Sequence, residues 1–326
     1  MDFIYTALGA VFGPIMNAIY QVVNNYGVAI ILFTVFCRVL MLPSALSQQK
    51  NQAKNQRMQY KMRKINEKYK GDRQRLAQEQ QEFYKREGYN PMSAGCSGGM
   101  MLQFPIIFGL IAAIYRPLTY TVKIGGKLIE KYEPGVIDKL TAAATEILKD
   151  ASGKASNTFQ AQLRIVESID KFKDMFGPGK LDMKIFEGIS EFAEHFRFGP
   201  WQLGLTPKEG GTFVYYLIPV LVGVSAMATS LYTMIRQRKT NPEQKQNAVM
   251  MSVMSLGMPM ISVMFSLSFP VGIGIYWIVS SLAALLQIVV LGYTHPPQKM
   301  LAKSMVDETI ERRSRENSRK KIAEIT

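Results

Sequence analysis

Cysteine and histidine are scarce in this sequence of 326 residues, which contains two of each. Cys37 and Cys96 cannot form a disulfide framework, and they cannot supply a four-ligand zinc site. His195 and His295 are too few for a histidine-based metal site, and a catalytic triad built on them is not expected. We therefore expect neither a metal nor any other cofactor.

Charged residues are missing from long stretches, although they make up 20% of the chain, of which 48% is hydrophobic. A helix that spans a membrane needs about 20 apolar residues. The run 246–294 contains no Asp, Glu, Lys or Arg, and Phe269-Pro270-Val271-Gly272 interrupts it near its middle, so it can supply two spans. Five membrane-spanning segments are therefore predicted, at residues 26–46, 98–115, 212–235, 249–269 and 272–293.

The N-terminal segment 1–25 is apolar over residues 3–23, but Gly13 and Pro14 interrupt this stretch. A secretory signal would begin with Lys or Arg, whereas this segment begins with Asp2. We expect an interfacial helix that lies on the membrane surface. A sixth span is the alternative.

Basic residues are concentrated in some of the connecting segments, in a chain whose net charge is +14. The segments 44–97, 236–245 and 295–326 together hold 24 basic and 11 acidic residues, whereas 116–211 holds 14 and 13. Cytoplasmic loops carry the excess of Lys and Arg. The N-terminus is therefore predicted outside, with a neutral extracytoplasmic insertion at 116–211. The cytoplasmic side then holds a helical hairpin, a loop and a basic tail, at residues 47–97, 236–248 and 294–326.

Within the cytoplasmic segment, Gly71-Asp72 separates two stretches with helical periodicity. The apolar positions form one narrow stripe on each stretch: Met58, Met62, Ile65 and Tyr69 on the first, and Leu76 and Phe83 on the second. Two antiparallel helices could pack along this seam. A solvated linker and a docking arm for an acidic partner or lipid head groups both fit the basic, Gln-rich remainder.

Amphipathic helices are expected within the insertion at 136–149, 158–176 and 181–196, with a break at Gly177-Pro178-Gly179. This pattern predicts a small helical layer. It contains no catalytic constellation, and His195 is interpreted as a surface or interface residue.

Arg38 is the one charged residue in the first predicted span. A charge at mid-membrane costs about 2.5–3.5 kcal/mol on insertion scales, so such residues face the bundle interior or water. The predicted spans contain no Asp or Glu that could pair with it. Arg38 is therefore interpreted as a cation in a hydrated groove, and the alternative is a side chain that snorkels to the cytoplasmic surface.

Polar residues recur in the spans and fit a hydrated cavity, although each alone could simply join two helices. They are Thr34, Gln103, Ser225, Thr229, Ser230, Ser262, Ser280, Ser281 and Gln287.

Three groups of motifs resemble a known family. The first is Arg38 followed by Pro43, Arg57-Met58 and Glu67-Lys68-Tyr69-Lys70. The second is Tyr84-Lys85-Arg86-Glu87-Gly88-Tyr89-Asn90-Pro91, then Gly95-Cys96 and Leu102-Gln103-Phe104-Pro105-Ile106. The third is Phe269-Pro270-Val271-Gly272 leading into Ile275-Tyr276-Trp277-Ile278-Val279-Ser280. Together they resemble the YidC/Oxa/Alb family of membrane protein insertases, over about residues 26–118 and 213–294.

The resemblance implies a five-helix core around a hydrophilic groove that is open to the cytoplasm and lipid and closed to the outside. It also implies that Arg38 receives hydrophilic portions of a nascent chain. Family members often carry Gln late in the third span, where this chain has Thr229-Ser230, and the role of the long insertion does not carry over. The predicted groove residues are Arg38, Thr34, Gln103, Thr229, Ser230, Tyr276 and Trp277.

We therefore predict an all-α polytopic protein of the bacterial plasma membrane that acts as an insertase and is not an enzyme. A secondary transporter or channel with an anion site at Arg38 is the alternative. Nascent membrane proteins are the expected substrates, and the ribosome, the Sec translocon and anionic lipids are candidate partners. Ribosome or lipid contacts are assigned to Arg312, Arg313, Arg315, Arg319, Lys320 and Lys321 in the tail and to Arg57 and Lys61 in the hairpin.

Overall fold

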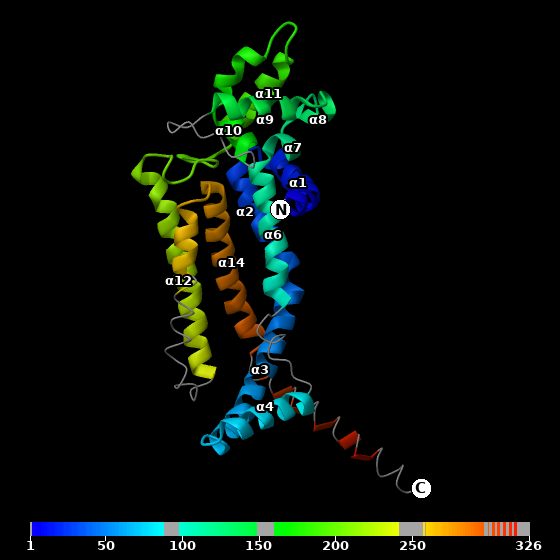
Figure 1. The fold of residues 1–326 in the computed structure, drawn as a ribbon, viewed down its shortest axis with the longest axis vertical. Coiled ribbons are helices and arrows are strands. Elements are labelled where there is room, and N and C mark those ends of the chain that lie inside the picture. The colour runs from blue at the N-terminus through cyan, green and yellow to red at the C-terminus, as the bar shows by residue number, and fades with distance from the viewer. Residues whose placement is uncertain are drawn as a thin grey trace. The chain divides into compact units, whose positions relative to one another are not determined.

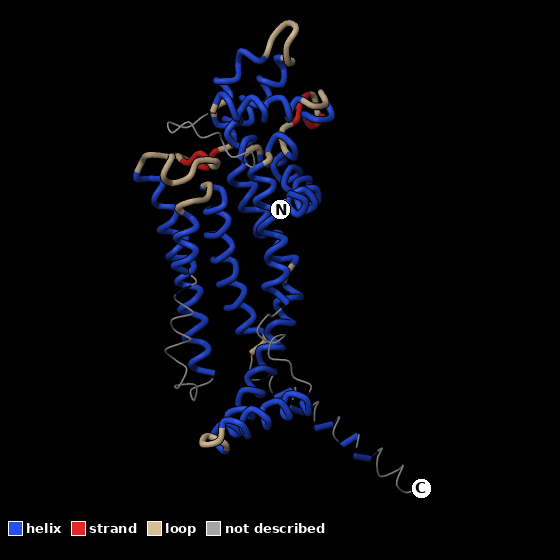
Figure 2. The backbone as a smooth tube through the Cα atoms, viewed as in Figure 1, coloured by secondary structure: helices blue, strands red, loops and turns tan. Residues whose placement is uncertain are grey.

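The computed structural model describes residues 2–87, 98–148, 160–240 and 259–296, together with residue 257 and isolated positions between 299 and 317. The chain is mostly helical (Figures 1 and 2), in agreement with an all-α membrane protein. It divides into two compact units. The first comprises Met1–Val39, Gln103–Tyr232 and Val249–Leu285, and the second comprises Leu40–Leu102, Thr233–Ala248 and Leu286–Thr326.

Three helices of the described part of the chain are long and apolar enough to cross a membrane. They lie within α1 (Asp2–Val23), α12 (Phe213–Thr240) and α14 (Val271–Thr294). The helices α2 (Tyr26–Leu40) and α3 (Leu42–Lys68) supply a fourth if α2 and the start of α3 form one broken span. In α6 (Gly98–Tyr115) the apolar helix Pro105–Tyr115 is shorter. The count of five spans stays a prediction.

The first predicted span, 26–46, is interrupted in the structure. The helix α2 ends at Leu40 and α3 begins at Leu42, with Pro43 in the first turn of α3. Proline lacks a backbone N–H but is tolerated in a first turn, where that group would have no partner within the helix. Pro43 therefore fits a helix start better than a helix interior.

In the first unit, α1 packs beside the insertion. Figure 1 shows α1 nearly end-on, whereas α6 and α14 are seen from the side. The ring of Phe12 packs edge-on against Phe33 of α2, and the ring of Tyr120 lies against Gly9 and Gly13. These contacts suit an interfacial helix, although α1 is also apolar enough to span. The interfacial position stays a prediction.

Tyr26 joins α2, α6 and the insertion at one point. Its side chain is fully buried, and its hydroxyl donates to the carbonyl of Ala113 in α6 at 3.0 Å. Its ring lies against Phe192 of the insertion and against Phe196, a few residues farther along the chain. A buried tyrosine whose hydroxyl is paired stabilises by both its apolar area and its hydrogen bond.

The described part of the insertion contains short helices and two small strand pairs. The helices are α7 (Pro117–Tyr120), α8 (Ile129–Tyr132), α9 (Val136–Ile147), α10 (Ala161–Glu167), the 3-10 helix η2 (Ile169–Met175) and α11 (Met183–His195). The antiparallel strand pairs are β1 (Lys123–Ile124) with β2 (Lys127–Leu128), and β3 (Arg197–Phe198) with β4 (Trp201–Gln202).

These helices enclose a hydrophobic core of their own. Fully buried residues come from η2, which contributes Phe172, and from five α-helices, which contribute Leu118, Ile129, Val136, Leu140, Leu163, Ile165, Ile185 and Ile189. Burial of each such side chain is worth about 1.5–3 kcal/mol. The insertion is therefore a packed layer and not an extended connection.

In the second unit, α3 and α4 (Arg73–Glu87) pack together after a turn at residues 69–72. Met58 of α3 and Phe83 of α4 are buried. Polar contacts accompany this packing, because the Gln80 amide donates to Asn66 at 2.9 Å and the Tyr69 hydroxyl donates to Glu79 at 3.1 Å. The rest of α4 is mainly exposed.

Candidate intramembrane polar site

Arg38 occupies the last turn of α2. Carbonyl groups at the end of a helix carry partial negative charge, so a guanidinium there is favourably placed. The described parts of α2, α6, α12 and α14 contain no Asp or Glu, so no carboxylate from them neutralises Arg38.

The guanidinium of Arg38 is held by a hydroxyl group of α14. Its Nη2 donates to Oγ of Ser280 at 2.5 Å, and Ser280 is itself buried. Tyr276 lies one helical turn before Ser280 on the same face of α14 and is also buried. A neutral hydroxyl accepts this hydrogen bond without cancelling the positive charge of Arg38.

A second polar contact joins α12 to the adjacent residue of α14. The Thr229 hydroxyl lies 3.0 Å from the carbonyl of Ser225 in its own helix and 3.0 Å from the carbonyl of Ser281. Arg38 of α2 and Thr229 of α12 therefore contact two consecutive residues of α14, Ser280 and Ser281. This brings together two of the predicted groove residues through α14.

The remaining predicted groove residues are placed differently. Thr34 is buried, and its hydroxyl donates to the carbonyl of Ile30 at 2.6 Å within α2. Trp277 is half-buried and packs edge-on against Phe269, with ring centroids 5.9 Å apart. Ser230 is half-buried in α12. Gln103 lies in α6, and its side chain is outside the described set.

Comparison with known proteins identifies the family. The sequence model of the 60Kd inner membrane protein family matches residues 18–298. The chain belongs to this family. The membrane protein insertase YidC of Zymomonas mobilis is 26% identical over 292 residues, which cover 89% of this chain and 38% of that protein. The YidC of Geobacter metallireducens is 23% identical over 277 residues, covering 84% and 35%. The YidC of Syntrophus aciditrophicus is 38% identical over 109 residues, covering 33% and 19%.

This chain spans less than two-fifths of the length of these YidC relatives. They are bacterial proteins named for insertion, and the 60Kd inner membrane protein family is not an enzyme family. The resemblance seen in the motifs is confirmed, and so is the prediction that the chain is not an enzyme. The family also agrees with the predicted location in the bacterial plasma membrane.

The structure describes only some of the basic residues that were assigned to ribosome or lipid contact. Arg313 is exposed in a helical turn of the tail, and Lys61 is half-buried in α3. Arg57 lies in α3, but its side chain is outside the described set. Outside the described residues altogether are Arg312, Arg315, Arg319, Lys320 and Lys321.

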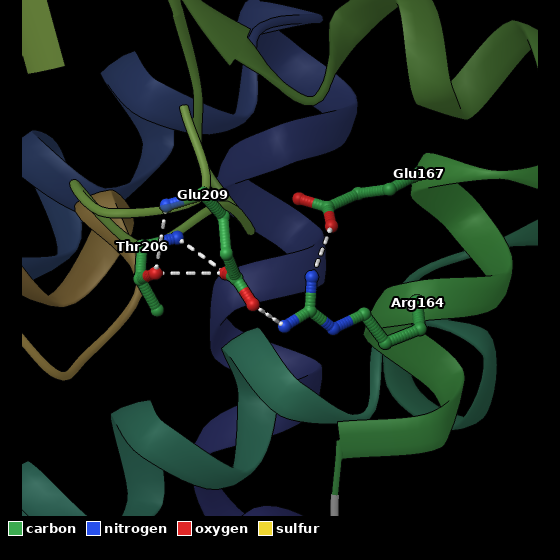
Figure 3. Close-up of polar contacts among 4 residues, drawn as sticks. All are labelled: Arg164, Glu167, Thr206 and Glu209. Atoms are coloured by element: carbon green, nitrogen blue, oxygen red, sulfur yellow. Dashed lines mark hydrogen bonds and ion pairs between the residues drawn. The ribbon is translucent and has the colours of Figure 1, made fainter. Parts of the chain in front are cut away.

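A charged cluster in the insertion was not predicted from the sequence. Arg164 lies between the carboxylates of Glu167 and Glu209 (Figure 3). The available signal was the spacing of Arg164 and Glu167, three residues apart on a helix with apolar neighbours. In the part of the chain that the structure describes, no three His, Cys, Asp or Glu side chains gather to hold a metal.

Proposed function

We propose that this protein is a membrane protein insertase that receives nascent hydrophobic segments and releases them into the bilayer. The observation that carries the proposal is Arg38, a cation held by a neutral hydroxyl in a helix bundle whose described spans contain no acidic residue. The YidC relatives support it by their name, over most of this chain.

The physical task is to lower the cost of moving polar groups through hydrocarbon. Each unsatisfied backbone group costs several kcal/mol there. A hydrophilic groove that is open to the cytoplasm would shorten the apolar distance that a polar flank must cross. Arg38 would attract acidic groups of that flank, and the apolar segment would leave sideways into lipid.

The proposed arrangement has five spans, with the N-terminus outside and the tail in the cytoplasm. The α3–α4 hairpin and the basic tail then face the ribosome and the anionic lipids of the inner leaflet. Lys and Arg bind both partners through phosphate groups, so either contact should weaken as salt is added. The Sec translocon is a further candidate partner.

The test is insertion of single-span clients into vesicles that contain only this protein. We expect Arg38→Ala to reduce insertion of a client with acidic flanking residues about 10-fold, which corresponds to about 1.4 kcal/mol. A client with neutral flanks should be affected much less. Arg38→Lys should retain most of the activity because the positive charge remains.

Arg197→Ala is the matched control, because it removes an exposed arginine of the insertion that lies outside the polar site. Equal insertion of both clients by Arg38→Ala would contradict the proposed role of the arginine. Anion flux through the vesicles without any insertion would favour the transporter or channel alternative.

A further inference from the structure

The last loop of the insertion, which precedes α12, contacts the first residues of α14. The carbonyl of Leu203 accepts the N–H of Gly272, and the carbonyl of Leu205 accepts the N–H of Val271, both at 2.9 Å. The first N–H groups of a helix have no partner within the helix. The loop therefore satisfies two of these donors and fixes where α14 begins.

The same loop is fastened to α10. The guanidinium of Arg164 donates to the carboxylate of Glu209, which also accepts the N–H of Thr206 at 3.0 Å and its hydroxyl at 2.8 Å (Figure 3). Gly204 packs directly on Glu167, and a methyl group at Gly204 would collide with that carboxylate. We call the contacts among α10, the loop Leu203–Glu209 and the start of α14 the clamp.

Glu167 is the member of the clamp whose charge is not balanced. Its side chain is 6% exposed, and neither of its carboxylate oxygens accepts a hydrogen bond from the described residues. Among the described residues, its cationic partner is Nη1 of Arg164 at 3.7 Å, and Arg164 is already hydrogen-bonded to Glu209. With both carboxylates ionised, one guanidinium would face two negative charges, and the charge of Glu167 would be buried without a hydrogen bond, which is costly, whereas Glu209 is 39% exposed.

We propose that the clamp is closed by a proton on Glu167, and that loss of this proton loosens the loop Leu203–Glu209 and the start of α14. The insertion would then stabilise the start of α14, and this stabilisation would depend on the pH on the side of the membrane where the insertion lies. One proton makes the cluster of Arg164, Glu167 and Glu209 electrically neutral. This inference does not depend on the proposed insertase activity.

The electrostatics of the two carboxylates are consistent with this assignment. Burial raises the pKa of Glu167 to about 8, although Arg164 opposes the rise, and Glu209 adds to it. Burial alone would raise the pKa of Glu209, but the hydrogen bonds from Arg164 and Thr206 lower it on balance. Of the two carboxylates, we therefore assign the proton to Glu167 and the negative charge to Glu209.

Among the residues that the structure describes, the other charges around α10 lie at the surface. The elements that pack on α10 are α7, which has no charged residue, and α9, η2 and α11. Their acidic and basic side chains are exposed: Asp138, Lys139, Glu146, Asp170, Lys171, Lys173, Asp174, Lys184, Glu187, Glu191 and Glu194. His195, which ends α11, contacts Asn24, and Lys208 of the loop is exposed.

The direction of the pH effect follows from the raised pKa. Glu167 binds its proton more tightly in the closed clamp than when it is exposed, where the ordinary pKa is 4.5. Its contribution is therefore complete below about pH 4.5, declines as the pH rises, and is lost once the pH passes about 8. Glu209 acts in the opposite sense and only in acid, since its lowered pKa places its titration below 4.5.

The proposal is tested by amide hydrogen exchange of the whole protein in lipid nanodiscs. The exchange rates are expressed as protection factors, which removes the intrinsic pH dependence of amide exchange. Protection at Val271 and Gly272 should fall about 10- to 100-fold between pH 6 and pH 9 in the wild type. In Glu167→Gln, which is neutral at every pH, it should stay level. The matched control Glu187→Gln changes an exposed glutamate of α11 and should behave as the wild type does.

Amides of α9 around Leu140 provide the internal reference, because they lie in the core of the insertion and outside the clamp. If their protection falls by the same factor, the whole insertion unfolds, and the proposed role of Glu167 in the clamp is wrong. A level wild-type profile, or an equally steep profile in Glu167→Gln, would also overturn it. Gly204→Ala, which displaces Glu167, should lower protection at Val271 at both pH values and is a second variant if Glu167→Gln does not fold.

Discussion

Ser280 is the residue that fixes the guanidinium of Arg38 in the described structure. Without its hydroxyl, Nη2 of Arg38 would lose that acceptor and the side chain would sample more rotamers. Arginine carries about 2 kcal/mol of rotamer entropy, so an unheld guanidinium binds an anion less well. The hydroxyl therefore positions the charge and need not touch the client.

Ser280→Ala should reduce insertion of acidic-flank clients about threefold, less than Arg38→Ala does, because the charge itself remains. Ser280→Thr should restore most of the activity, since it returns a hydroxyl. Ser281→Ala is the matched control, because the contact of Ser281 with Thr229 uses its main-chain carbonyl. The measurement is the ratio of acidic-flank to neutral-flank insertion, and an unchanged ratio in Ser280→Ala would contradict the positioning role.

Arg38 could be identified from the sequence because it is a single charge in an apolar segment. Its partner could not be identified, because Ser280 follows 242 residues later and is one of several hydroxyl residues in the spans. Thr34 was predicted to line the groove, but its hydrogen bond stays within its own helix. A hydroxyl in a span can bond to its own helix, and in the structure it does so.

At the scale of elements, helical periodicity predicted α9 and α11 to within two residues at either end. The segment 158–176 is different, because α10 ends at Glu167 and a 3-10 helix follows Ser168. Residues 149–159, which include the first two residues of this predicted helix, lie outside the described part. The apolar spacing around Ser168 is compatible with both helix types, so tertiary packing decides between them.

Among the side chains that the structure describes, Met58 and Phe83 are the buried apolar residues where α4 packs on α3, and Phe83 is almost completely buried. Phe83→Ala should destabilise this pair of helices by about 3 kcal/mol, the low end for a buried phenylalanine. Limited proteolysis near the Gly71 turn should then be faster by an order of magnitude or more. Gln81→Ala, an exposed change on α4, is the control, and equal cleavage of both variants would contradict the seam.

At the scale of the whole molecule, the periodicity of the insertion was visible in the sequence, but its clamp was not. The clamp depends on main-chain carbonyls of Leu203 and Leu205, which carry no signal in side-chain chemistry. It also depends on Glu167, which resembles any surface glutamate in a sequence of alternating charges. Because α14 also carries Ser280, a loosened clamp would affect the helix whose hydroxyl group accepts the hydrogen bond from Arg38.

The number of spans and the sides of the membrane are tested together by cysteine labelling in intact cells. Cys37 and Cys96 are first replaced, and single cysteines are introduced at the exposed positions Gly71, Lys171 and Asn317. With five spans and cytoplasmic basic segments, an impermeant maleimide should label position 171 from outside. Positions 71 and 317 should react only after the membrane is opened.

A cysteine at Asp2 then decides the place of α1. An interfacial α1 leaves position 2 on the same side as position 171, whereas a spanning α1 moves it to the side of position 71. The contact of Tyr120 with Gly9 and Gly13 places α1 beside the insertion, so we expect labelling from outside. Labelling of position 2 only in opened cells would establish a sixth span. External labelling of position 71 would overturn the orientation derived from the basic residues.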